Sequence, residues 1–166
     1  MQKFATLSDA IALAEFAHRN QQDKAGLPYI DHPRRVLAKV QAQGALPYVQ
    51  MAAILHDVTE DTAFTSSILR MLGFSEAAIN VVDLLDRDFS KKRWEVEYSW
   101  ERIGDKPRPT ADEFYYAEIK KVPGAKLVKL ADIEDNLSDW RLSYLSDETQ
   151  ARLRAKYAKA KEILNG

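Results

Sequence analysis

One stretch of this chain, residues 125–137, is compatible with very few folds. Its apolar residues recur at positions that leave almost no polar face on a helix: Leu127, Leu130, Ala131, Ile133 and Leu137. A helix that is apolar on nearly every side must be covered by other elements, so we expect it to be the central helix. Asp132 lies within that apolar run. Because burying an unpaired carboxylate costs several kcal/mol, the sequence predicts a basic partner or a metal ion beside Asp132.

The other segments also repeat their apolar residues with helical spacing. Polar caps and apolar stripes predict helices over residues 7–21, 33–43, 47–61, 65–72, 75–85, 110–121 and 147–164. Ser8 is the expected N-cap of the first helix, and Pro123 and Gly124 are expected to break the chain before the central one. No segment alternates with the period of two that marks a half-buried strand. We therefore expect an all-α fold.

Residues 86–109 depart from this regular pattern. Lys91, Lys92 and Arg93 stand among aromatic residues, and Gly104 and two prolines follow. Basic and aromatic side chains together can hold single-stranded nucleic acid, but this is one short cluster in a chain of net charge −1. We expect a surface excursion, or a lid over a phosphorylated substrate, and no nucleic-acid partner.

Length and composition limit the class of protein. A chain of 166 residues fits one domain, here residues 1–166. The chain has no cysteine, which excludes thiolate nucleophiles and cysteine-based zinc sites. The N-terminal residues lack the apolar core of a signal peptide, and no apolar run is long enough for a membrane helix. We expect a cytoplasmic protein without a membrane partner; a homo-oligomer is left open.

The stretch from Ala53 to Thr62 carries the densest chemistry. An apolar run leads into His56 and Asp57, and Glu60 and Asp61 follow. On a continuous helix, residues four apart share a face, so His56 would align with Glu60 and Asp57 with Asp61. Possible metal ligands and acid/base groups would then project from the same end of one helix.

Two further residues complete a set of possible metal ligands. His32 stands at a helix entry and Asp132 in the central helix, so the set is His32, His56, Asp57 and Asp132. Imidazole and carboxylate ligands suit a divalent ion such as Mn, Fe, Co, Zn or Mg, with positions left for water and a substrate oxygen. The two nearby acids would then orient or deprotonate the attacking water. His18 is instead expected in the core or behind the ligands.

Three segments resemble the motifs of one family. Residues 26–33 are similar to its GxPYIxHP segment, residues 56–62 to HDxxEDT, and residues 123–132 with Asn136 to VKLAD…N. They occur in the family's order and span most of the chain. The chain thus resembles the HD-domain metal-dependent phosphohydrolases, and among them the RelA/SpoT-type hydrolase domains and the stand-alone small alarmone hydrolases.

This resemblance implies a compact all-helical HD domain that binds one divalent metal ion, usually Mn²⁺. Family members remove the 3′-pyrophosphate of the nucleotides guanosine tetra- and pentaphosphate. Carried over by position, the metal ligands would be His32, His56, Asp57 and Asp132. The catalytic acids would be Glu60 and Asp61, and the substrate contacts Lys24, Asn136 and Tyr157.

The sequence departs from the family pattern beside the substrate loop. Asp23 replaces an arginine that stacks on the base, Ala25 replaces a residue that is often serine, and Asp135 replaces the histidine that many members have before Asn136. A second hypothesis therefore keeps the metal site and changes the substrate to an adenosine alarmone, NADPH or a nucleoside monophosphate. A third is a catalytically inactive, nucleotide-binding regulatory module.

Overall fold

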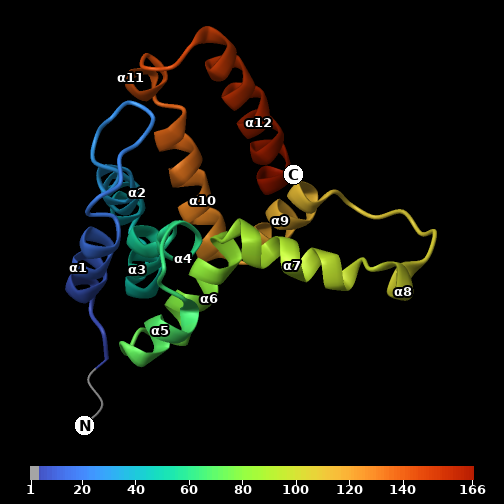
Figure 1. Cartoon of the computed structure of the whole chain (residues 1–166), viewed down its shortest axis with the longest axis horizontal. Coiled ribbons are helices and arrows are strands. Elements are labelled where there is room, and N and C mark those ends of the chain that lie inside the picture. The colour runs from blue at the N-terminus through green and yellow to red at the C-terminus, as the bar shows by residue number, and fades with distance from the viewer. Residues whose placement is uncertain (1–3) are drawn as a thin grey trace.

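The computed structural model describes residues 4–166, except for the side chains of Trp100 and Glu101. Within that part of the chain all regular elements are helices (Figure 1). The N-terminal half contains α1 (Leu7–Ala17), α2 (Asp31–Ala42), α3 (Pro47–Leu55), α4 (Val58–Asp61), α5 (Ser66–Met71) and α6 (Glu76–Leu85). The C-terminal half contains α7 (Arg87–Glu97), α8 (Trp100–Ile103), α9 (Ala111–Lys120), α10 (Pro123–Asn136), α11 (Asp139–Leu142) and α12 (Asp147–Asn165). The all-α prediction is confirmed.

Side-chain caps explain where several helices begin. Thr6, not the predicted Ser8, caps α1: its hydroxyl accepts the N–H of Asp9, and the Asp9 carboxylate accepts the N–H of Thr6. Thr110 and Glu113 make the same reciprocal pair at α9. Each such box satisfies two backbone donors that a helix start leaves free. The first helix ends at Ala17, earlier than predicted, because the chain turns into a loop that the Gln22–Pro28 bridge closes.

The prediction of one helix over residues 47–61 is wrong. Helix α3 ends at Leu55 and α4 begins at Val58, so His56 and Asp57 form the joint between them. On a continuous helix, adjacent side chains point about 100° apart. The break lets these two neighbours turn toward the same point instead.

Helix α10 is central, as its apolar pattern predicts. It packs against α2, α3, α6, α9 and α12. Pro123 and Gly124 do not precede it but form its first turn, where proline is tolerated. A Cβ on Gly124 would lie 2.9 Å from Cγ2 of Val49, so the missing side chain allows α10 to approach α3 closely. This approach brings Asp132 toward the α3–α4 joint.

Residues 86–109, the predicted surface excursion, contain an eleven-residue helix, α7. In Figure 1, α7, α8 and the next loop extend away from the helices around α10. Within this region, the Trp94 indole N–H donates to the Pro109 carbonyl at 2.9 Å, which connects α7 to the end of the following loop. The lid role of this region stays a prediction.

Helix α12 packs mainly on α9 and touches α10 less. Figure 1 shows the start of α12 standing apart from α10. No helix among the described residues is both long and apolar enough to cross a bilayer.

Candidate active site

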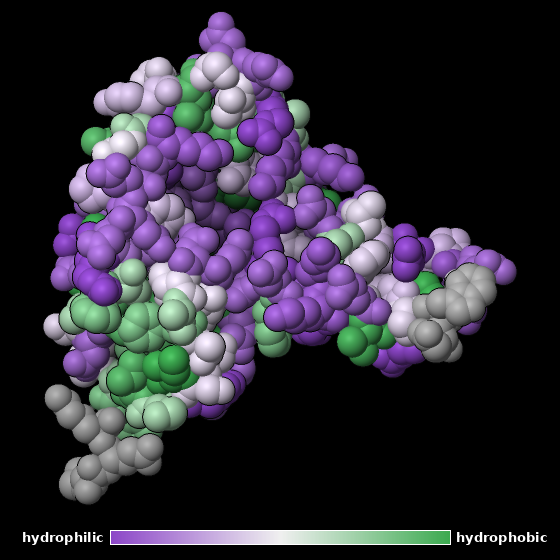
Figure 2. Space-filling view, viewed as in Figure 1, coloured by the Kyte–Doolittle hydropathy of each residue, from purple (hydrophilic) through white to green (hydrophobic). Residues whose placement is uncertain are grey.

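A cavity of about 430 Å³ opens beside α10 and α12. In Figure 2 the same face shows a central hollow surrounded mainly by hydrophilic residues. Three of the four predicted metal ligands line the cavity, and so do all the predicted catalytic and substrate residues: Lys24, Glu60, Asp61, Asn136 and Tyr157. Segments more than a hundred residues apart therefore meet at one concave site, the usual form of a small-molecule site.

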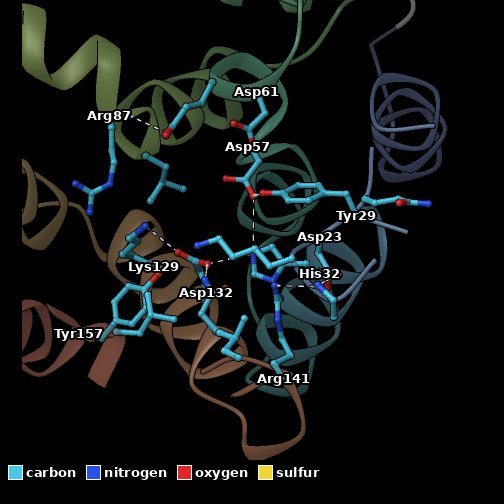
Figure 3. Close-up of a pocket in the computed structure, with 18 residues that line it drawn as sticks. Asp23, Tyr29, His32, Asp57, Asp61, Arg87, Lys129, Asp132, Arg141 and Tyr157 are labelled. Carbon is cyan, nitrogen blue, oxygen red and sulfur yellow. Dashed lines mark hydrogen bonds and ion pairs between the residues drawn. The ribbon is translucent and has the colours of Figure 1, made fainter. Parts of the chain in front are cut away.

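His32, Asp57 and Asp132 converge at this cavity (Figure 3), and His56 lies beside Asp57 and Asp132. Nε2 of His32 is 3.8 Å from Oδ2 of Asp57 and 3.1 Å from Oδ1 of Asp132. Nε2 of His56 is 3.1 Å and 4.0 Å from the same two oxygens. One ligand atom each from His32, His56 and Asp57 lies within 4.8 Å of the other two, a spacing that suits a shared cation.

The two imidazoles are oriented by hydrogen bonds on their far sides. Nδ1 of His56 donates to the Ala53 carbonyl at 2.8 Å, and Nδ1 of His32 to the Asp135 carboxylate at 2.7 Å. The Nε2 lone pairs are therefore directed at the two aspartates, which is the arrangement of metal-binding histidines. Nε2 of His56 is buried and has no aligned hydrogen-bond partner, although Asp57 is close. This donor set fits a divalent ion.

The electrostatics of the cluster also favour a cation. Burial alone would lower the pKa of His56, but the charges of Asp57 and Asp132 raise that pKa to about 9. Lys129 supplies further positive charge, because its Nζ donates to Oδ2 of Asp132 at 2.7 Å. The sequence predicted a basic partner or a metal ion beside Asp132, and Lys129, one helical turn away, is such a basic partner.

Glu60 and Asp61 face the cavity from α4. Burial and the neighbouring carboxylates raise the pKa of Glu60, against the backbone N–H of Arg87, which donates to it at 3.0 Å. Burial and the Asp57 charge likewise raise the pKa of Asp61. Carboxylates with raised pKa values are stronger bases than ordinary ones, as proton transfer requires.

The structure adds three residues to which the sequence analysis gave no role in the site. Asp135, only 1% exposed, accepts hydrogen bonds from Nδ1 of His32 at 2.7 Å, Nε of Arg35 at 2.7 Å and Nη1 of Arg141 at 2.7 Å. Burial would raise the pKa of Asp135, but these three donors hold it well below its usual range. In the sequence, only the position of Asp135 beside Asn136 pointed to the site. Nothing in the sequence pointed to Arg35 or Arg141.

The predicted substrate residues differ in how they are held. Nδ2 of Asn136 donates to Oδ1 of Asp132 at 2.5 Å, so its side chain also orients a predicted ligand. Tyr157 is 8% exposed, and burial raises its pKa to about 12. Lys24 lines the loop side of the cavity. Its neighbour Asp23 accepts the N–H groups of Ala25 and Leu27, which shapes that loop.

His18 lies outside the ligand cluster. It is 1% exposed, and its Nδ1 lies 2.7 Å from Oε1 of Gln21. Its ring packs against Tyr29, with ring centres 5.0 Å apart. The expected place in the core is confirmed.

Several known proteins are similar to this chain in sequence or in fold. No family model matches the chain. The protein named guanosine-3′,5′-bis(diphosphate) 3′-pyrophosphohydrolase MESH1 of Mus musculus is 29% identical over 98% of this chain and 84% of its own length. A GTP pyrophosphokinase of Streptomyces coelicolor is 30% identical over 93% of this chain, which spans only 16% of that protein.

A solved structure of a metazoan ortholog of SpoT, described as hydrolysing ppGpp, matches with a TM-score of 0.73 and 24% identity. The match covers 100% of this chain and 89% of that one, and it shows a shared fold. Motifs, fold and relatives agree with one another. The chain is therefore similar in sequence and in fold to the HD-domain phosphohydrolases of the RelA/SpoT type.

Proposed function

We propose that this protein removes the 3′-pyrophosphate of guanosine tetra- or pentaphosphate, giving GDP or GTP and pyrophosphate. The observation that carries the proposal is the convergence of His32, His56, Asp57 and Asp132 beside two raised-pKa acids in one cavity. The MESH1 relatives, which carry this activity in their name, align over nearly the whole chain.

The four converging side chains would hold one divalent ion, which we propose is Mn²⁺. When bound, such an ion neutralises phosphate charge and lowers the pKa of water beside it. The carboxylates of Asp57 and Asp132 and the oriented imidazoles supply the hard and borderline donors that this ion takes.

Glu60 and Asp61 would orient the attacking water and accept its proton. The water oxygen forms a bond to the phosphorus attached at the ribose 3′-oxygen, and the bond between that phosphorus and the 3′-oxygen breaks. The 3′-oxygen leaves and takes up a proton, so the products are GDP or GTP and pyrophosphate. Lys24, Asn136 and Tyr157 would hold the nucleotide during this step.

The test is hydrolysis of guanosine tetraphosphate by the purified protein with added Mn²⁺. We expect equal amounts of GDP and pyrophosphate, loss of turnover in Asp132→Asn and Glu60→Gln, and loss of bound metal only in Asp132→Asn. Full activity of metal-free Asp132→Asn would contradict the scheme.

A second candidate keeps the site and changes the base. It is favoured by Asp23, whose Oδ1 accepts two backbone N–H groups and whose Oδ2 is 3.9 Å from Nη2 of Arg141. No arginine from position 23 can therefore stack on a base here. A panel of guanosine tetraphosphate, an adenosine alarmone, NADPH and nucleoside monophosphates decides between the two. Nucleotide binding without any turnover would instead indicate a regulatory module.

A further inference from the structure

The cavity has a basic wall that the proposed chemistry leaves unused. Arg87 from α7 and Lys129 from α10 both lie against the ring of Tyr115: the Arg87 guanidinium carbon is 4.6 Å from the ring centre, and Lys129 Nζ is 5.5 Å from it. Both side chains line the cavity together with Tyr157. Figure 3 shows these three on one side, opposite Asp23 and Arg141.

Lys156 extends this wall from α12. It lines a neighbouring cavity of about 540 Å³ with Asp112 and Tyr116. The Tyr116 hydroxyl accepts a hydrogen bond from Nη2 of Arg87 at 2.7 Å, so this pair lies between the two cavities. Burial lowers the pKa of Lys156, and the charges of Arg87 and Lys129 lower it further, as expected when like charges are held close.

The three cations differ in how far they are neutralised. Arg87 pairs with Asp112 at 2.7 Å, and Lys129 with Asp132 at 2.7 Å. Among the residues that the structure describes, Lys156 has no carboxylate partner, and its ammonium lies 5.4 Å from the ring centre of Tyr157. Arg87 and Lys129 also keep N–H donors beyond those used in these pairs. The wall therefore has one uncompensated charge and spare donors, which suit an anion.

We propose that Arg87, Lys129 and Lys156 form a second anion subsite, which takes the 5′-phosphates of the nucleotide while the 3′-pyrophosphate lies at the ligand cluster. The proposal rests on the proposed function. Asp57, Glu60 and Asp61 also line the cavity, with Glu60 directly beside the Arg87 backbone, and their charges repel any phosphate that is not held at the ligand cluster or by a cation. A phosphate at the far end of the substrate needs a cation beside it. The basic wall supplies Arg87 and Lys129, and Lys24 and Arg141 are the other cations that line the cavity.

The first test is the binding of GDP, which has only 5′-phosphates, to the metal-free protein by titration calorimetry. The variant Lys156→Gln should weaken binding about fivefold, the scale of a partly exposed ion pair. Lys156→Arg should retain affinity because it keeps the charge. Lys161→Gln is the matched control, since it removes the same charge from the same helix, and it should bind like the unmodified protein. Unchanged affinity in Lys156→Gln, or no GDP binding by the unmodified protein, overturns the subsite.

The second test separates this proposal from the proposed function. For guanosine tetraphosphate, Lys156→Gln should raise KM about fivefold and leave kcat nearly unchanged. For guanosine 3′-diphosphate, which lacks 5′-phosphates, KM should not change. Equal effects on both substrates contradict the subsite while the hydrolase stands. Weakened GDP binding in Lys156→Gln, without any hydrolysis by the unmodified protein, supports the subsite and contradicts the hydrolase.

Discussion

The hydroxyl of Tyr29 donates a hydrogen bond of 2.7 Å to Oδ2 of Asp57, 28 residues further along the chain. The same oxygen lies 3.1 Å from Nε2 of His56, so Tyr29 holds a carboxylate that the metal proposal uses. Burial and the Asp57 charge raise the pKa of Tyr29 far above its usual value. Its hydroxyl therefore stays protonated and remains a donor over the whole working pH range.

Replacing Tyr29 by phenylalanine should weaken Mn²⁺ binding about 10- to 100-fold, the range seen when a group behind a metal ligand is lost. The ring and its packing on His18 are kept, so the fold should be little affected. Calorimetric titration with Mn²⁺ measures the affinity, and kcat at saturating metal should recover to near the normal value. An unchanged affinity would show that Asp57 needs no such support.

Replacing Glu60 by glutamine should lower kcat by about 10²- to 10⁴-fold, because glutamine keeps the shape of the side chain but cannot accept the proton of the water. Metal content should stay normal, since Glu60 is outside the proposed ligand set. Glu95→Gln on α7 is the control. It also removes an exposed carboxylate, but Glu95 does not line the cavity. A less than tenfold loss would assign the proton transfer to another group.

The acidic side of the pH–rate profile reports on the same residue. Burial raises the pKa of Glu60, and a base loses activity as the pH falls through its pKa. The rate should therefore decline at a higher pH than the ordinary glutamate pKa of about 4.3. Measuring kcat at saturating metal and substrate from pH 4 to 8 checks this, and a decline only near the ordinary value would exclude Glu60 as the group that sets the profile.

Lys129 and Asp132 should stabilise the metal-free protein as a pair. Removing either partner leaves the other charge buried, which costs on the order of 3 kcal/mol. Removing both by Lys129→Gln with Asp132→Asn should cost less than the sum of the single variants by about 1 to 3 kcal/mol. Urea unfolding of the four proteins in chelator gives the values. Strictly additive losses would mean that the contact of 2.7 Å carries little energy.

Asp135 should make stability depend on pH. Its pKa is held well below the usual range by His32, Arg35 and Arg141, against the effect of burial. A carboxyl group with a depressed folded pKa stabilises the fold above its unfolded pKa of about 3.9, and that contribution is lost as pH falls toward the folded value.

The variant Asp135→Asn should therefore lose on the order of 3 kcal/mol at pH 7 and clearly less at pH 3. Unfolding measurements in chelator at both pH values test this, because metal binding then plays no part. A loss of equal size at pH 3 and pH 7 would show that packing, not charge, is what Asp135 contributes.

Most helices could be predicted because their signals are local. The predicted segments 33–43, 65–72, 75–85, 110–121 and 147–164 agree within two residues with α2, α5, α6, α9 and α12. The Lys129–Asp132 pair also had a local signal, since residues three apart face each other on a helix. The break at His56 had none: the apolar run continues to Val58, and only packing of both neighbours reveals it.

The sequence alone determined the kinds of chemistry available: two histidines and two aspartates in three segments, the acids beside them, and a central helix that must be buried. Tertiary structure decided which groups meet. His32 and Asp135 are 103 residues apart, and Arg141 reaches both from α11. Helical periodicity depends on neighbours within a turn or two, whereas such contacts depend on how α2 packs against α10, which no local pattern encodes.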